Sequence, residues 1–548
     1  MAEASMGPTS STISADAKAA MLLVSGPMTW MERLTDRLNP IFVKEGRQSL
    51  RSKTFVIAFL LLVFTGWFIS AIGVLSNIGS LDYGDAGREM FQWYFGVLAV
   101  AITLVVPFGA FRSLITERDE YTFEPLVITS LSPRQIVVGK LMTAMLQAFL
   151  FYSAIAPFMA FTSLLNGFDM AYAVFLLVFG LLYSLLISSA SLAIGSLVHG
   201  RVWQTIVSLV ILGGLLFALG MEFGFAFGSG FERQLNDSDF WLGFGAVSLG
   251  AVSYIILLQQ IAIINLTFEA DNRSTGMRVI AFGQFAIFWI IGYGIAGLWP
   301  TSFGGGSISW SDIAEIGMVL GTLHWSILGL PMVTERNDLS VRVQTSLPRL
   351  SLFRLFVTPF LPGGMRGLIL VLGSVGLLWL MVRHGLMMST YPYDLNSFVD
   401  ILCLYLAVHA MVASLLAQGM YFFWPSMKPS HVRAGVVVVF LLMWMLPLFV
   451  VAYFESQRAY NVFSMLYVTS PFIAMDAMGS NASRMTMLTL ELLVWGGIML
   501  ACCLWPMFLA LLEVVNAPIR TTRNDRDLTN SNDPNSAMFD EDHDMAES

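Results

Sequence analysis

Three glutamates in a short charged segment have a spacing that could form a working surface. Glu117, Glu120 and Glu124 stand at positions i, i+3 and i+7, so they share one face if the preceding helix continues past residue 115. Pro125 would then stop or bend that helix. The result would be a stiff acidic knob, whose chemistry is charge and force transmission rather than bond making. A merely solvated loop is the alternative.

A helix start follows this acidic segment. Ser132, Pro133 and Gln135 match the N-cap, the proline of the first turn and the capping-box residue of a new helix. The chain from 116 to 133 is therefore predicted to form a helix–turn–helix hairpin just below the membrane.

A basic segment precedes the first apolar stretch. Pro40 can begin a helix, and Lys44, Arg47 and Arg51 then fall at positions i, i+3 and i+7 on one stripe. Such a helix can rest on an anionic inner leaflet before the chain enters the bilayer. Ordinary positive charge flanking a membrane helix is the alternative.

Polar side chains are rare inside the apolar stretches, and each is costly to bury in lipid. Such a group either lines a transport pathway or forms a hydrogen bond between helices. His409 and Glu491 would relay protons in a secondary transporter, although neither has an obvious partner in the sequence. The candidates are Gln147, Gln259, Gln260, Gln284, His324, His409, Gln418 and Glu491.

Catalytic and nucleotide-binding motifs are missing from the sequence. It contains no G-x-S-x-G or H-E-x-x-H motif, and no phosphate-binding G-x-x-x-x-G-K-[ST] loop. Cys403, Cys502 and Cys503 have neither a disulfide nor a metal-binding spacing. The chain is therefore predicted not to be an enzyme, and to bind no cofactor, metal or nucleic acid.

The elements that carry these residues are predicted from composition. Of the 548 residues 56% are hydrophobic and 12% are charged, whereas a soluble domain has about 25% charged residues. Stretches of about 20 apolar residues, the length that spans a bilayer as a helix, recur along the chain. We predict an all-α membrane bundle with about twelve spanning segments, at 54–77, 93–115, 137–162, 170–198, 203–225, 241–267, 279–300, 312–333, 366–390, 397–424, 433–453 and 485–512.

Lysine and arginine lie mainly in alternate loops, which places both termini in the cytosol. The chain is thus predicted to be a multi-pass protein of the plasma (inner) membrane. A re-entrant segment near 465–478 would change the helix count. The acidic end of the chain, from Asn524 to Ser548, is predicted to be disordered.

One short sequence recurs. Thr116-Glu117-Arg118-Asp119 follows the second apolar segment, and Thr334-Glu335-Arg336-Asn337-Asp338 follows the eighth. Six helices separate the copies, which is the offset of a tandem six-helix duplication. Chance, or a six-helix unit fused to an unrelated six-helix partner, is the alternative. The predicted divisions are a cytosolic segment 1–38, helical halves 39–270 and 271–515, and a tail 516–548.

The basic segment and the acidic hairpin together resemble parts of the ABC exporter permeases of the second type. A leading Asn-Pro with a later Lys-Glu and Arg-x-Lys is similar to the family's elbow helix. Thr-Glu-Arg-Asp-x-x-Thr-x-Glu-x-Leu, with a Thr-x-Leu-Ser-Pro turn and the Gly139-Lys140 pair, is similar to its coupling hairpin. The resemblance covers chiefly residues 39–200. The second half departs from it, because Ser340-Val341-Arg342-Val343 replaces the Thr-x-Glu pattern and no Asn-Pro elbow precedes the seventh helix.

The resemblance implies roles for particular residues. The ATPase-coupling surface would comprise Glu117, Arg118, Asp119, Glu120, Thr122, Glu124 and Leu126, shaped by Ser132 and Pro133. The elbow would comprise Asn39, Pro40, Lys44, Glu45, Arg47 and Arg51. A second, degenerate coupling loop would comprise Thr334, Glu335, Arg336 and Pro348.

The function implied is the membrane subunit of an ATP-driven exporter. A separate ATPase, as a dimer, would bind ATP and Mg²⁺, and this chain would contact lipid and an unidentified substrate. An ion-coupled secondary transporter and a scaffold that transports nothing are the alternatives. The sequence leaves open the substrate and whether a second permease is needed.

Overall fold

The computed structural model describes most of the apolar chain. The described residues are 39–76, 86–119, 132–165, 167, 169–198, 201–228, 235, 238–267, 272–298, 309–388, 396–455, 469–472 and 482–517. They are almost entirely helical and include no strand, and twelve of their helices are long and apolar enough to span a membrane. The prediction of an all-α polytopic membrane protein is confirmed. The N-terminal segment 1–38, the tail beyond residue 517 and most of 465–478 lie outside this description.

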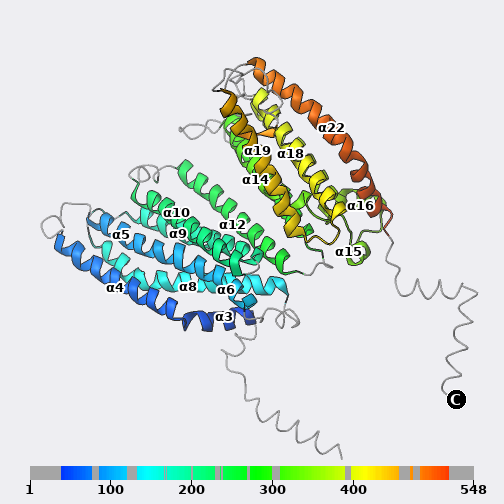
Figure 1. The fold of residues 1–548 in the computed structure, drawn as a ribbon. Coiled ribbons are helices and arrows are strands. Elements are labelled where there is room, and N and C mark those ends of the chain that lie inside the picture. Colours follow the sequence, from blue (N-terminus) through cyan, green and yellow to red (C-terminus); the bar gives the residue numbers. More distant parts are fainter. Residues whose placement is uncertain are drawn as a thin grey trace, which may run out of the picture. The chain divides into compact units, whose positions relative to one another are not determined.

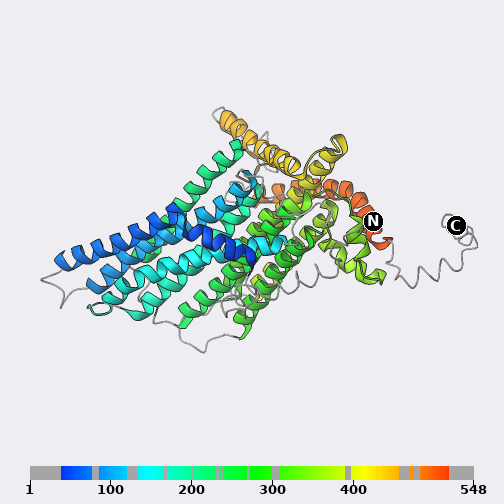
Figure 2. The ribbon, with the colours of Figure 1, turned by 90° about the horizontal axis from the view of Figure 1, so that it is seen from below.

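The chain divides into two compact units, Met1–Leu266 and Thr267–Ser548. The helices of the first unit lie side by side in Figure 1, and Figure 2 gives a second view of them. They are α3 (Pro40–Leu50), α4 (Lys53–Ser76), α5 (Ala86–Val100), the π-helix η1 (Ala101–Val105), α6 (Val106–Asp119), α8 (Pro133–Thr162), α9 (Met170–Leu197), α10 (Arg201–Phe227) and α12 (Ser238–Leu266). α5, η1 and α6 form one continuous span.

The second unit also contains six of the candidate spans. Its elements are α13 (Thr275–Leu298), α14 (Trp310–Val333), α15 (Val341–Thr345), α16 (Ser351–Val357), the short 3₁₀ helix η2 (Thr358–Phe360), α17 (Gly364–Met388), α18 (Asn396–Phe423), α19 (Pro429–Glu455) and α22 (Ala482–Val515). α15, α16 and η2 are short and lie within the connection between α14 and α17.

Four helix pairings recur in the two units. In the first unit the second span packs on α8 and α9, α8 packs on α9, and α9 packs on α12. In the second unit α14 packs on α17 and α18, α17 packs on α18, and α18 packs on α22. When the spans are numbered within each unit, both sets are the pairs 2 and 3, 2 and 4, 3 and 4, and 4 and 6. This shared pairing is what two copies of one six-helix unit would give.

Small residues allow some of these helices to approach closely, as in other membrane bundles. Gly367 of α17 lies against the backbone carbonyl of Met332 in α14, so that a Cβ atom there would clash with it. In the first unit, a Cβ atom on Gly195 of α9 would lie 3.1 Å from the carbonyl oxygen of Phe111 in α6. Both contacts lie between the second span of a unit and a later one.

The sequence placed the start of the second span too late. We predicted it at residue 93, whereas α5 begins at Ala86. The hydropathy pattern ends at the charged pair Arg88 and Glu89, but a helix tolerates such residues in its first turn, where Glu89 also complements the helix dipole.

Candidate functional site

The predicted elbow forms a helix, α3, with the expected start. The Asn39 side chain accepts a hydrogen bond of 3.0 Å from the backbone N–H of Ile41, and Pro40 occupies the first turn. An N-cap side chain of this kind satisfies one of the unpaired N–H groups that begin every helix. The predicted helix start at Pro40 is therefore confirmed.

The elbow helix lies against the first turns of α8 (Figure 1, Figure 2). Asn39 Nδ2 donates a hydrogen bond of 2.5 Å to the carbonyl oxygen of Gln135. One turn later Gly139 faces Ile41, whose Cβ atom would lie 2.9 Å from any Cβ atom added at the glycine. The absence of a side chain at Gly139 thus allows α3 to touch α8.

A buried ion pair fixes this contact. Lys140 Nζ lies 2.9 Å from Glu45 Oε1, and the two side chains are 1% and 14% exposed. Lys140 also donates a hydrogen bond of 3.4 Å to the carbonyl oxygen of Ser113 in α6. Because a buried charge is costly unless it is paired, these contacts bind α3, α6 and α8 together. We call this three-helix contact the elbow junction.

The basic stripe lies on the free side of the elbow. Lys44, Arg47 and Arg51 are all exposed, whereas Ile41 and Gly46 are buried. Arg51 follows the last helical residue as the C-cap. The stripe is therefore present as a surface that an anionic membrane face could contact.

The acidic hairpin is described only at its two ends. The helix before it ends at Asp119, and the Thr116 hydroxyl donates a hydrogen bond of 3.0 Å to the Arg112 carbonyl. At the other end, Ser132 and Gln135 form the predicted capping box and Pro133 begins α8, which confirms that helix start. The remaining predicted coupling residues lie outside the described residues or have undescribed side chains: Glu117, Arg118, Asp119, Glu120, Thr122, Glu124 and Leu126.

The corresponding loop of the second unit is folded against its own helices. Glu335 accepts hydrogen bonds from Arg278, at 2.5 Å, and from the backbone N–H of Gly363, at 3.0 Å. Arg336 is half-exposed and lies 2.5 Å from the exposed Asp338. The side chain of Thr334 bonds back to the Leu330 carbonyl at 2.8 Å.

Three buried arginines clamp this connection. Arg278 donates to the carbonyl oxygens of Pro359, Leu361 and Gly363. Arg354 donates to Pro348 at 2.7 Å, Val515 at 3.1 Å and Ala517 at 2.6 Å, in each case through the backbone oxygen. Arg366 binds Glu513 Oε2 at 2.9 Å and the Asn337 carbonyl at 2.6 Å. We call these residues the arginine clamp.

The sequence analysis counted the clamp arginines only as charges that orient the chain. Nothing in their local sequence distinguishes them from the exposed Arg342 or Arg349. Each donates to backbone oxygens of residues 54–163 positions further along the chain, in addition to nearer partners. Their structural role therefore depends on tertiary contacts.

A buried glutamate in α10 was missed by the sequence analysis. Glu222 is fully buried, and its Oε2 atom accepts a hydrogen bond of 2.5 Å from the Thr103 hydroxyl. Its Oε1 atom has no hydrogen-bond partner among the described residues. The signal was present, since an acid within an apolar segment is rare, and Glu222 stands inside the predicted segment 203–225, but it was not counted among the polar candidates.

The π-helix η1 positions Thr103 for this contact. A π-helix inserts one extra residue into a helix and disturbs the regular backbone bonding, often at functional positions. Here the Ser184 hydroxyl of α9 donates a hydrogen bond of 2.6 Å to the Ile102 carbonyl. The neighbouring residue, Thr103, turns its hydroxyl to Glu222 on α10. Three spans therefore meet at the irregular turn.

The polar residues that the sequence predicted inside helices remain separate in the structure. His409 is stacked on Tyr405, whose carbonyl lies 2.9 Å from its Nδ1 atom, and His324 Nε2 lies 3.0 Å from the Ala281 carbonyl. Gln418 bonds to Asn337 and to the Glu335 carbonyl, as a helix-bridging amide would. Among the described residues no hydrogen bond joins His409 to Glu491, and no metal-ligating group of three side chains occurs.

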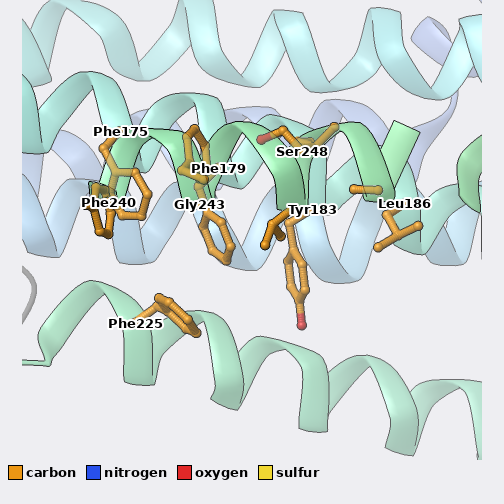
Figure 3. A pocket seen from close by; sticks show the side chains of 12 residues that line it. Phe175, Phe179, Tyr183, Leu186, Phe225, Phe240, Gly243 and Ser248 are labelled. Atoms are coloured by element: carbon orange, nitrogen blue, oxygen red, sulfur yellow. The ribbon is translucent and has the colours of Figure 1, made fainter. Parts of the chain in front are cut away.

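An aromatic cavity of about 370 Å³ lies among α9, α10 and α12. Figure 3 shows Phe175, Phe179 and Phe240 on one side of it, with the Tyr183 hydroxyl pointing towards the helix that carries Phe225. That hydroxyl donates a hydrogen bond of 3.0 Å to the Ala218 carbonyl in α10. The cavity can hold an apolar group.

Comparisons with family models, with curated proteins and with solved structures found no match for this chain. The chain is thus defined here as a multi-pass helical membrane protein made of two six-helix units.

Proposed function

We propose that this chain is the membrane-spanning subunit of an ATP-driven exporter whose ATPase is a separate chain. The observation that carries the proposal is the elbow junction, where Lys140 binds Glu45 and the Ser113 carbonyl. α6 leads into the hairpin at 116–133 and α8 leads out of it. A force on the hairpin would therefore reach α3, α6 and α8 as one packed group, as coupling through a rigid element requires.

In this mechanism the partner ATPase binds ATP and Mg²⁺ and closes as a dimer. Its closure presses on the acidic hairpin and moves the spans between inward-facing and outward-facing states. The exposed basic stripe of the elbow holds α3 at the inner face of the plasma (inner) membrane, with both chain termini in the cytosol. The chain itself then performs no catalysis and binds no cofactor.

The connection 334–363 would be a weaker contact for the ATPase. Glu335 is bound by Arg278 and by the Gly363 amide, so it offers little to a partner. Arg336 and Asp338 keep exposed side chains beside it. We therefore assign the main coupling role to the first unit.

The test is copurification in mild detergent. The tagged wild-type chain is compared with Glu117→Ala/Glu124→Ala and with the matched control Glu89→Ala/Glu315→Ala. The control removes two exposed glutamates, Glu89 from the first turn of α5 and Glu315 from the second turn of α14, near the opposite ends of the spans that lead into the two loops. Bound chains are identified by sequence, and ATP hydrolysis is measured in the purified sample.

We expect a P-loop ATPase with the wild type and the control, and its loss from the hairpin variant. If no ATPase accompanies a folded, monodisperse wild-type sample, the proposal is wrong. Flux that then depends on a proton or sodium gradient would identify a secondary transporter. A stable complex without ATPase and without flux would identify a scaffold.

A further inference from the structure

α10 is held to its unit by a line of polar contacts. The acceptors on α10 are the Ala218 carbonyl, the Glu222 carboxylate and the Ala226 carbonyl, which are spaced four residues apart and so lie on one face. Their donors come from three different elements: Tyr183 and Tyr172 in α9, Thr103 in η1, and Gln92 in α5. We call this line the α10 seam.

The other side of α10 adds little packing. Leu216, Phe217 and Met221 are largely exposed. Hydrogen bonds between helices are a main source of association where no hydrophobic driving force exists. The seam therefore adds to the apolar contacts of Ile211, Leu215 and Phe225 in holding α10 in its unit, and Glu222 is its middle contact.

Glu222 is the one ionisable acceptor of the seam, and the described part of the chain gives it no positive partner. No described lysine, arginine or histidine forms an ion pair with it. Among the described residues, two phenols lie close enough to interact electrostatically with Glu222: Tyr152 of α8 and Tyr183 of α9. Tyr152 itself donates to the Leu177 carbonyl and Tyr183 to the Ala218 carbonyl. A buried carboxylate without a counter-charge is strongly disfavoured, so something must neutralise it.

We propose that Glu222 is a proton-binding site, with Oε1 as the atom that carries the exchangeable proton and Thr103 holding Oε2. Oε1 is buried and has no hydrogen-bond partner among the described residues, which leaves it available for a proton. A metal cation would need several further oxygen ligands, and no described group of three acidic, histidine or cysteine side chains provides them. The inference does not depend on a partner ATPase.

Binding and release of this proton would change how α10 docks. The neutral acid fits the dry interior of the unit, whereas the carboxylate would draw water or a cation towards Oε1. The adjoining contacts of Tyr183 and Gln92 with α10 would feel that change first, because they lie one helical turn away on either side. Glu222 is thus the point at which pH can act on the first unit.

The test is infrared difference spectroscopy on the purified full chain in lipid nanodiscs. Spectra of wild type at neutral pH are compared with those of Glu222→Gln and of the control Glu491→Gln, which removes a different membrane-embedded acid. We expect the C=O stretch of one protonated carboxyl group in the wild type, its loss in Glu222→Gln and its retention in the control. Thr103→Val, of similar shape, should shift the band by removing the hydrogen bond, and Thr103→Ser should restore it.

Three results would overturn the proposal. One is a wild-type spectrum that has no such band at neutral pH. Another is a band that survives in Glu222→Gln. The third is a band that disappears on addition of sodium or potassium at constant pH, which would show a cation site instead. If Glu222→Gln does not fold, the Thr103 variants decide the question, because only a carboxyl group bonded to Thr103 would change its frequency with that hydroxyl.

Discussion

The loops that follow the second span of each unit begin alike, and their described ends are held by different contacts. Thr116 and Thr334 both bond back to a carbonyl four residues earlier, at the ends of α6 and α14. Beyond Thr334 the second unit folds its loop inward, where Glu335 meets the arginine clamp. The described ends of the first loop, in α6 and α8, are joined to the neighbouring helix α3 by the elbow junction. A loop whose charged groups are bound within its own unit has fewer left for a partner.

The largest effect is expected from breaking the clamp. Arg278→Met should destabilise the protein by about 3–5 kcal/mol, because it leaves Glu335 without its buried partner and frees several carbonyl oxygens. Thermal unfolding in detergent measures this against Arg349→Met, which removes an exposed arginine of the same connection. Equal melting temperatures for the two variants would show that the clamp contributes nothing.

A smaller effect is expected at the elbow junction. Lys140→Met leaves the partly exposed Glu45 unpaired and should cost about 2–3 kcal/mol. Adding Glu45→Met should recover much of that loss, because the pair is then replaced by apolar groups. Unfolding of the two single variants and the double variant gives the coupling energy. Additive losses would argue against a direct ion pair.

The close contact of the elbow can be tested at a glycine. Gly139→Ala places a Cβ atom against Ile41 and should cost about 1–2 kcal/mol. At Gly213 in α10 nothing lies within reach of a Cβ atom, so Gly213→Ala should stabilise its helix slightly. Opposite signs in the two melting temperatures are the expected outcome, and stabilisation by both changes would mean that α3 does not lie against α8.

The smallest effect is expected at the start of α8. Ser132→Ala removes the capping box and should cost about 1 kcal/mol. Ser163→Ala, at the other end of the same helix, removes only a hydroxyl that bonds to the preceding turn. The melting temperature of Ser132→Ala should therefore fall below that of Ser163→Ala. A larger fall in melting temperature for Ser163→Ala than for Ser132→Ala would mean that the capping box does not stabilise the start of α8.

Features that depend on neighbouring residues were predictable from the sequence. The helix starts at Pro40 and Pro133 follow from a capping side chain before a proline, and the spans follow from apolar stretches of sufficient length. The basic stripe followed from its spacing alone. The placement of Glu117, Glu120 and Glu124 on one helix face stays a prediction, because their side chains lie outside the described part of the chain.

Features that depend on distant partners were not predictable. Lys140 meets Glu45 across 95 residues, and Arg354 meets the Ala517 carbonyl across 163. Their sequences show a charge near a membrane helix and nothing about what it binds. The Glu222 contact joins Thr103 to a residue 119 positions away, through a π-helix that no simple period reveals.

The extra residue in η1 also sets how α6 is rotated about the helix axis. Successive residues of an α-helix are turned by about 100° around its axis, so the insertion decides which way α6 faces after Ala101–Val105. Deleting one residue there would rotate α6, including Thr116, by about 100° around the helix axis. The contacts within α6 itself would stay the same. The direction in which Thr116 faces is therefore set at Ala101–Val105, in the middle of the candidate span Ala86–Thr116.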